Sequence, residues 1–187
     1  MDPKALIFDC DGTLADSMPV HYLVWAKTMA RHSIGFTEKR FYELAGWPAD
    51  KVAAQLALEG GKPLDALAVS QEKDREFIRQ IHLVRPNELV VAVARRHRGV
   101  IPMAVGSGTV RRIVEKELSA LGILEWFEAI VCAEDVERHK PEPDVFLAAA
   151  QRLGVLPADC VVYEDGDPGL EAARRAGMQC VDVRTMR

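Results

Sequence analysis

Five short apolar runs constrain the fold of this 187-residue chain more than any other feature. They lie at 5–9, 100–105, 129–133, 160–164 and 179–183, and helix-like segments near 88–97, 109–120, 143–153 and 168–176 precede or separate the later four. Strands that alternate with helices form parallel sheets through right-handed crossovers. The sequence therefore predicts an α/β fold with a doubly wound parallel sheet.

One connection is far too long for a single crossover. About 90 residues separate the first apolar run from the second, whereas a crossover helix with its loops needs only a few tens. Apolar residues at helical spacing fill this segment, and Ser17 is a candidate N-cap for its first helix. We expect residues 1–15 and 85–187 to form a Rossmann-like core and residues 16–84 to form an inserted α-helical cap.

Two aspartates follow the first run. Asp9 and Asp11 stand one residue apart where a buried strand ends, and Gly12 then allows a sharp turn. One carboxylate could attack phosphorus while the other transfers protons. The alternatives are a capped turn and a calcium loop. The calcium loop fails, because Leu14 and Val20 occupy the positions where glycine and glutamate are required.

The negative charge of this motif calls for a metal ion. Two unit charges about 4 Å apart repel by about 4 kcal/mol at an effective dielectric constant of about 20, and an approaching phosphate adds to this. Mg²⁺ suits such a site because it takes carboxylate, phosphate and water oxygens in octahedral geometry. We therefore expect Mg²⁺ as the cofactor.

Three further motifs occur in order along the chain. The second apolar run ends in Gly106-Ser107-Gly108, Lys140 is followed by Pro-Glu-Pro-Asp, and the fourth run ends in Glu164-Asp165. With Asp9-x-Asp11-Gly12-Thr13, this set resembles the haloacid dehalogenase superfamily of aspartate-nucleophile phosphohydrolases. The strands of a parallel sheet place such residues together at their carboxyl ends.

The resemblance implies a role for each motif. Asp9 and Asp11 would be catalytic, and Ser107, Gly108 and Lys140 would bind the phosphate, which suits a hydroxyl donor, an accessible amide and a compact cation. Asp9, Asp11, Glu164 and Asp165 would hold the metal. The chain departs from the family after this acidic pair: the family often has a serine there, whereas this chain has Gly166 and then a third acid, Asp167. Which carboxylate touches the metal is thereby left open, and the alternative for Asp167 is to cap the next helix.

The start of the cap resembles one subgroup of this family. Asp16-Ser17-Met18-Pro19-Val20-His21 and Trp25 match the β-phosphoglucomutase-like subgroup, and within it bacterial phosphatases of the fructose 1-phosphate type. His21, Trp25, Lys51 and Lys73 are the candidate substrate contacts. Three of them have an alternative: an exposed helical histidine for His21, packing in the cap for Trp25, and a solvated charged face for Lys73.

Three functions stay open from the sequence. The first is a Mg²⁺-dependent phosphatase acting on small sugar phosphates such as fructose 1-phosphate through an aspartyl phosphate. The second is a β-phosphoglucomutase-type phosphosugar isomerase, which the absence of arginine from 46–51 disfavours. The third is an idle phosphometabolite-binding protein, against which the complete motif set argues. A P-loop kinase is excluded, because Pro63 follows Gly60-Gly61-Lys62.

Composition narrows the partners and the compartment. A formal net charge of -4 and the lack of a basic cluster argue against nucleic acid and against an anionic membrane as partners. No apolar stretch is long enough to span a bilayer and no signal peptide is evident, so we expect a cytoplasmic protein. The four cysteines stand singly, which favours reduced thiols. The oligomeric state is left open, with a monomer expected.

Overall fold

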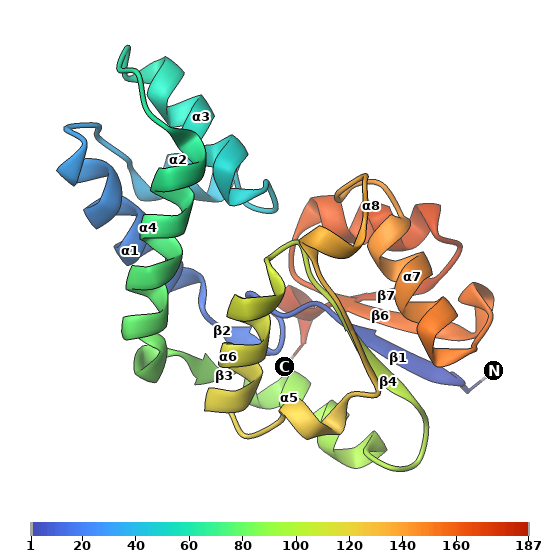
Figure 1. The fold of residues 1–187 in the computed structure, drawn as a ribbon. Helices are drawn as coiled ribbons and strands as arrows, with labels where there is room; N and C mark the ends of the chain where they lie inside the picture. Colours follow the sequence, from blue (N-terminus) through green and yellow to red (C-terminus); the bar gives the residue numbers. More distant parts are fainter. Residues whose placement is uncertain (1, 187) are drawn as a thin grey trace.

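A five-stranded parallel sheet forms the centre of the computed structural model, which describes residues 2–186 (Figure 1). Its strand order is β5-β4-β1-β6-β7, so the first strand lies in the middle. The strands are β1 (Ala5–Phe8), β4 (Met103–Gly106), β5 (Ala129–Val131), β6 (Cys160–Glu164) and β7 (Gln179–Asp182). The predicted doubly wound α/β fold is confirmed.

The middle strand β1 is buried on both faces, because its successive side chains point alternately into two hydrophobic clusters. Leu6 and Phe8 point into the cluster that contains helices α5 (Glu88–His97) and α6 (Arg111–Ala120). Ala5 and Ile7 point into the cluster with α7 (Asp144–Leu153) and α8 (Asp167–Arg175). The middle strand is thereby held rigidly at the position from which Asp9 and Asp11 emerge.

The second strand begins later than the sequence pattern indicated. Residues 100–102 were expected in the strand, but β4 starts at Met103. Pro102 has no amide hydrogen to donate to a ladder, which favours a strand that starts after it. Short 3₁₀ turns connect several elements, at Ile81–Leu83, Leu124–Trp126, Ala133–Asp135, Pro157–Asp159 and Val183–Thr185.

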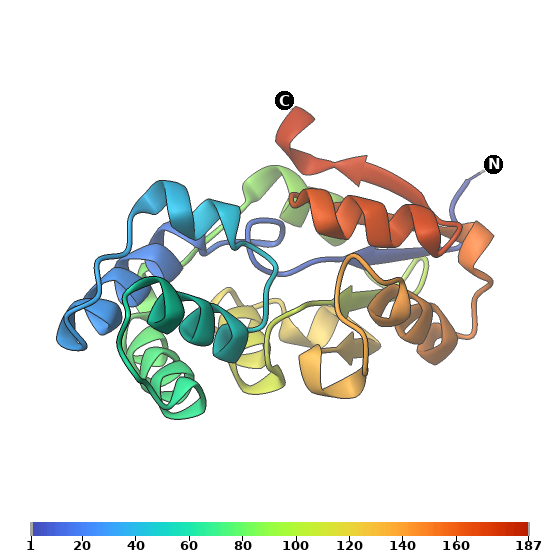
Figure 2. The same cartoon turned by 90° about the horizontal axis from the view of Figure 1, so that it is seen from above.

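Four helices lie beside the sheet and form the cap. They are α1 (Met18–Arg31), α2 (Glu38–Glu43), α3 (Ala49–Glu59) and α4 (Ala66–Arg79), and they bury a hydrophobic cluster of their own. Figures 1 and 2 show them to one side of the sheet, in blue to green. The boundaries 1–15 and 85–187 for the core and 16–84 for the cap stay a prediction.

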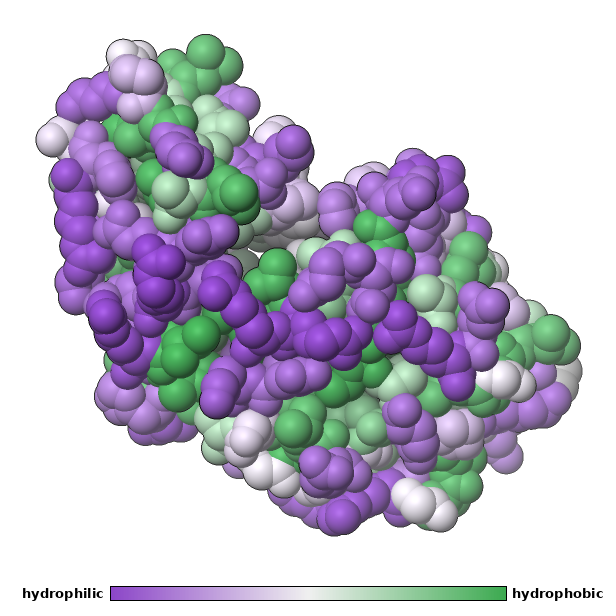
Figure 3. All heavy atoms as spheres, in the orientation of Figure 1, coloured by the Kyte–Doolittle hydropathy of each residue, from purple (hydrophilic) through white to green (hydrophobic). Residues whose placement is uncertain are grey.

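The chain passes into the cap and returns through a pair of very short strands. β2 (Ala15–Asp16) and β3 (Arg85–Pro86) run antiparallel, with Ala15 opposite Pro86 and Asp16 opposite Arg85. Two residues are too few to give a periodic pattern, so the sequence offered no sign of this pair. Figure 3 shows the surface hollowed between the cap and the core. Within residues 2–186, no helix has the length and hydrophobicity needed to cross a membrane.

Candidate active site

Asp9 lies directly after β1 and is almost completely buried. Its amide donates to the carbonyl oxygen of Tyr163 at 3.0 Å, which extends the pairing of β1 with β6 by one residue. Burial first, and the neighbouring Glu164 second, raise the pKa of Asp9 well above its ordinary value. The carboxylate therefore needs positive charge beside it to be ionised.

Lys140 supplies one such charge. Its Nζ donates to Asp9 Oδ1 at 2.6 Å and to Glu164 Oε2 at 2.7 Å. Burial alone would lower the pKa of Lys140, but the two carboxylates raise it above its ordinary value, so the ammonium stays charged. The other oxygen of Glu164 accepts from the amides of Asp165 and Gly166 at 3.1 and 2.9 Å. Glu164 is thus fixed by two backbone amides and in turn holds the Lys140 ammonium beside Asp9.

Three carboxylates form an acidic group suited to a cation. Oxygens of Asp9, Glu164 and Asp165 lie within 4.8 Å of one another. Burial, followed by the charge of Glu164, raises the pKa of Asp165 to about 7. Gly12 allows the Asp165 carboxylate to lie close to the backbone that follows β1. At φ +82°, a Cβ on residue 12 would lie 2.2 Å from Asp165 Oδ2. Clustered hard oxygen donors of excess negative charge fit a divalent ion such as Mg²⁺.

The side chain of Asp11 lies in a different network from the other three predicted metal ligands. Asp11 Oδ1 accepts from Ser17 Oγ and pairs with His21 Nε2, both at 2.6 Å, and Oδ2 accepts from Thr109 Oγ1 at 2.7 Å. Burial acts to raise the pKa of Asp11, but His21 and the two hydroxyls outweigh it and hold the pKa well below its usual range. Ser17 occupies the predicted N-cap position, yet makes no side-chain cap, because its hydroxyl bonds Asp11.

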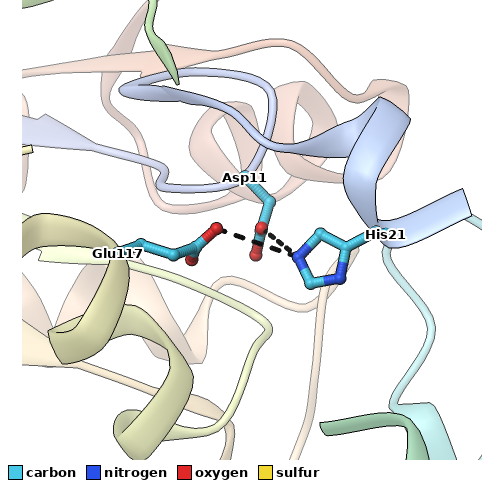
Figure 4. Close-up of side chains that lie close together, drawn as sticks. All are labelled: Asp11, His21 and Glu117. Carbon is cyan, nitrogen blue, oxygen red and sulfur yellow. Dashed lines mark hydrogen bonds and ion pairs between the residues drawn. The ribbon is translucent and has the colours of Figure 1, made fainter. Parts of the chain in front are cut away.

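A second acid faces Asp11 from the core. Glu117 of α6 is fully buried, and its Oε1 lies 3.8 Å from His21 Nε2 without a hydrogen-bond partner (Figure 4). Its Oε2 accepts from the thiol of Cys10 at 3.5 Å. Burial, and then the charge of Asp11, raise the pKa of Glu117 well above its ordinary value.

Two of the predicted phosphate-binding residues, Ser107 and Gly108, follow β4 at its carboxyl end. Ser107 is buried, and its hydroxyl accepts from the amide of Thr109 at 3.0 Å. A Cβ on Gly108 would lie 3.8 Å from the carbonyl oxygen of Gly46, so the loop that follows α2 reaches this part of the core.

The four predicted cap contacts lie in different environments. His21 is buried, stacks on Phe77 at 3.9 Å between ring centroids, and touches Asp11, so it is not an exposed histidine. Trp25 packs in the cap cluster, as its alternative held. Lys73 is buried, which excludes a solvated face, and its Nζ lies 5.3 Å from the Phe77 ring centroid. Lys51 is exposed, with its nearest carboxylate, Asp50, at 3.9 Å.

Sequence reasoning missed Thr109 and Glu117. Glu117 had a signal, because it falls on the stripe of α6 that also contains Ile113, Val114 and Leu118, where a charged residue is out of place. Thr109 stands two residues after Ser107 and had no signal of its own. Asp167 is the first residue of α8 and not its N-cap, which is Gly166; its side chain is exposed and pairs with Arg184 at 2.7 Å.

The four cysteines are free thiols: Cys10, Cys132 and Cys160 are buried and Cys180 is partly buried, as expected for reduced residues.

Comparison with known proteins identifies the family. The family model of the haloacid dehalogenase-like hydrolases matches residues 3–177. The chain is 42% identical to the fructose-1-phosphate phosphatase YqaB of Escherichia coli, over 97% of this chain and 96% of the relative. It is 30% identical to the β-phosphoglucomutase of Bacillus subtilis, over 96% and 83% of the two chains.

Solved structures agree. CbbY from Rhodobacter sphaeroides, in complex with phosphate, superposes with a TM-score of 0.86 at 26% identity, covering 95% of this chain and 84% of that one. The β-phosphoglucomutase from Clostridium difficile gives a TM-score of 0.85 at 25% identity, covering 96% and 83%. The chain is therefore an enzyme that belongs to the haloacid dehalogenase-like hydrolases.

Proposed function

We propose that this enzyme is a Mg²⁺-dependent phosphatase that hydrolyses small sugar phosphates, such as fructose 1-phosphate, through an aspartyl-phosphate intermediate. The observation that carries the proposal is the division of the two aspartates between separate networks. Asp9 is fixed by the Lys140 ammonium, whereas Asp11 is held by His21 and two hydroxyls. The carboxyl beside a fixed ammonium is suited to act as the nucleophile, and the one among hydroxyls and an imidazole is suited to transfer protons.

In this proposal Asp9 is the nucleophile. One of its oxygens attacks phosphorus, the ester P–O bond breaks, and the leaving sugar oxygen takes a proton from Asp11. Water then attacks the aspartyl phosphate, Asp11 accepts its proton, and phosphate leaves as the Asp9 carboxylate re-forms. Because its present contacts favour the carboxylate, Asp11 must leave His21, Ser17 and Thr109 before it carries a proton.

Lys140, Ser107 and Gly108 bind the phosphoryl group in this proposal. The Lys140 ammonium balances charge beside the attacking oxygen, and the Ser107 hydroxyl and Gly108 amide lie at the same sheet edge. Asp9 and Asp165 would hold Mg²⁺, with Glu164 and Asp11 as the further predicted ligands, and the bound ion would offset the repulsion between carboxylates and phosphate.

The cap supplies the substrate preference. His21 and Lys73 are its candidate contacts with the sugar, because both lie where α1 and α4 face the core site. A fructose 1-phosphate-like substrate is supported by the 42% identity to a relative named for that activity.

A phosphate-release screen over hexose, pentose and acid-sugar phosphates tests the proposal, with and without Mg²⁺. Asp9→Asn should abolish turnover and leave the far-UV circular dichroism unchanged, because an amide cannot form the phosphoenzyme. Asp167→Asn is the matched control: it removes an exposed aspartate that follows β6 and should retain full activity. Normal turnover by Asp9→Asn would refute the nucleophile assignment.

The 30% identity to a β-phosphoglucomutase keeps a mutase as the second candidate. A mutase must hold a second phosphate and must exclude water while the bisphosphorylated sugar reorients in the site. Lys51, the one basic residue in the segment 46–51 where the arginine is missing, is exposed. Incubation with β-glucose 1-phosphate and catalytic glucose 1,6-bisphosphate should therefore release phosphate, whereas rapid formation of glucose 6-phosphate with little free phosphate would establish the mutase.

A further inference from the structure

A carboxylate of the cap is shared between a cap lysine and a core arginine. Asp74 of α4 is buried, and its Oδ2 accepts from Arg112 Nη2 of α6 at 2.7 Å. Its Oδ1 lies 3.5 Å from Nζ of the neighbouring Lys73. Helices α4 and α6 pack against each other, so this carboxylate sits where cap meets core (Figure 1).

Lys73 is held loosely although it is buried. A charge-assisted hydrogen bond between an ammonium and a carboxylate spans about 2.7–2.9 Å, and 3.5 Å is well outside that range. No other carboxylate oxygen within residues 2–186 lies within 4.0 Å of the ammonium. The rings of Phe77 and Trp25 support it at 5.3 and 5.8 Å. Its N–H donors are therefore free for an anionic or hydroxyl-bearing ligand.

The hydrogen bond from Arg112 explains why Lys73 does not form a direct hydrogen bond with Asp74. Two cations lie beside this buried carboxylate, and the guanidinium makes the shorter and therefore stronger hydrogen bond. The guanidinium thus decides where the carboxylate lies. Without Arg112 the carboxylate would be left with a single buried cation, and the two would close into a direct pair. The lysine donors would then be withdrawn from the site.

We propose that Arg112 is a positioning residue for substrate binding: by holding Asp74 from the core, it keeps the Lys73 ammonium free to contact the sugar phosphate. The inference rests on the proposed function, in which Lys73 is a substrate contact. In this proposal, the substrate contact on α4 depends on a residue of α6.

Steady-state kinetics of Arg112→Met test this role. We expect KM for the sugar phosphate to rise about tenfold, as for coupled neighbours, with kcat changed less than twofold. The inhibition constant of inorganic phosphate should not change, because phosphate alone needs only the core residues. Arg112→Lys should restore most of the affinity. Arg31→Met is the matched control, since it removes an exposed cap ion pair with Glu72 on α4 and should leave KM unchanged.

A double-mutant cycle separates positioning from a general loss of positive charge. If Arg112 acts through Asp74, the Arg112→Met change has no further effect in an Asp74→Asn background. Equal effects of Arg112→Met in both backgrounds, or a parallel weakening of phosphate inhibition, would overturn the proposal.

A crystal structure of Arg112→Met gives a readout that does not depend on the substrate. We expect Lys73 Nζ to move to within hydrogen-bond distance of Asp74, and an unchanged separation of 3.5 Å would refute the inference even if no sugar phosphate is turned over. Lys73→Met tests the underlying contact separately: if it leaves KM unchanged, the proposed role of Lys73 fails, whatever the crystal structure of Arg112→Met shows.

Discussion

Adding one methyl group at Gly169 should disable the site from a position that touches no substrate. Gly169 lies in the first turn of α8, and a Cβ there would fall 2.0 Å from Glu164 Oε2 and 2.1 Å from its carboxyl carbon. Real Cβ atoms essentially never approach closer than 3.0 Å, so the carboxylate must move by about 1 Å or more. The same oxygen accepts from Lys140 at 2.7 Å, and Lys140 holds Asp9.

The expected loss follows from that displacement. A misplacement of about 1 Å in a catalytic arrangement costs roughly 10²-fold in rate, or about 2.7 kcal/mol of transition-state stabilisation. We therefore predict that Gly169→Ala lowers kcat for phosphate release roughly 10²-fold. Alanine is a better helix former than glycine by about 1 kcal/mol, which should offset in urea unfolding only part of the cost of displacing the buried carboxylate.

Two controls make this prediction sharp. Gly35→Ala adds a methyl group where no atom lies within 4 Å and should leave kcat unchanged. In a Glu164→Ala background, Gly169→Ala should cost nothing further, because the carboxylate it displaces is already gone. A Gly169→Ala enzyme within threefold of the wild-type kcat would refute this reasoning.

Three other predictions concern the acid–base pair, the metal and the cap. Asp11→Asn should reduce kcat far more for sugar phosphates than for aryl phosphates, since only poor leaving groups need a proton; an equal loss on both, measured by phosphate release, would contradict the role. Chelator should abolish activity and Mg²⁺ restore it, and Asp165→Ala should raise the Mg²⁺ concentration for half-maximal activity; full activity in chelator would exclude a metal. Lys27, Gln80 and Arg79 lower the pKa of Glu76 from 4.5 to about 2, so its stabilisation is present above pH 4.5 and is lost as pH falls toward 2. The stability deficit of Glu76→Gln in urea unfolding should therefore shrink over that range, and a constant deficit would oppose this assignment.

The sequence predicted the core well because its signals are local. Apolar runs and helical spacing identified every strand of the large sheet, with β4 shortened at Pro102. The motif residues then converge because parallel strands end at one edge: Asp9 and Lys140, 131 positions apart, lie 2.6 Å apart.

Contacts between distant polar side chains escaped prediction, because no periodicity encodes them. Ser17 looked like a helix cap, whereas its hydroxyl bonds Asp11. A solvated charged face was the alternative for Lys73 and its neighbour Asp74, yet both are buried, because Arg112 of α6 and Trp25 of α1 lie against them beside Phe77 of α4 itself. Such partners become visible only when the cap is placed against the core.

The strand pair β2–β3 bears on how this chain could change over generations. Because Ala15 stands opposite Pro86, the two ends of the inserted segment meet like the ends of a hairpin turn. To the five-stranded sheet, everything between them is equivalent to one surface loop, and long insertions in loops cost little closure entropy. Apart from the start of α1, where Ser17 and His21 hold Asp11, the intervening helices can therefore be lengthened, shortened or exchanged while the register of β1 stays fixed. The β2–β3 pair therefore lets the substrate preference of the cap change while the catalytic residues of the core are kept.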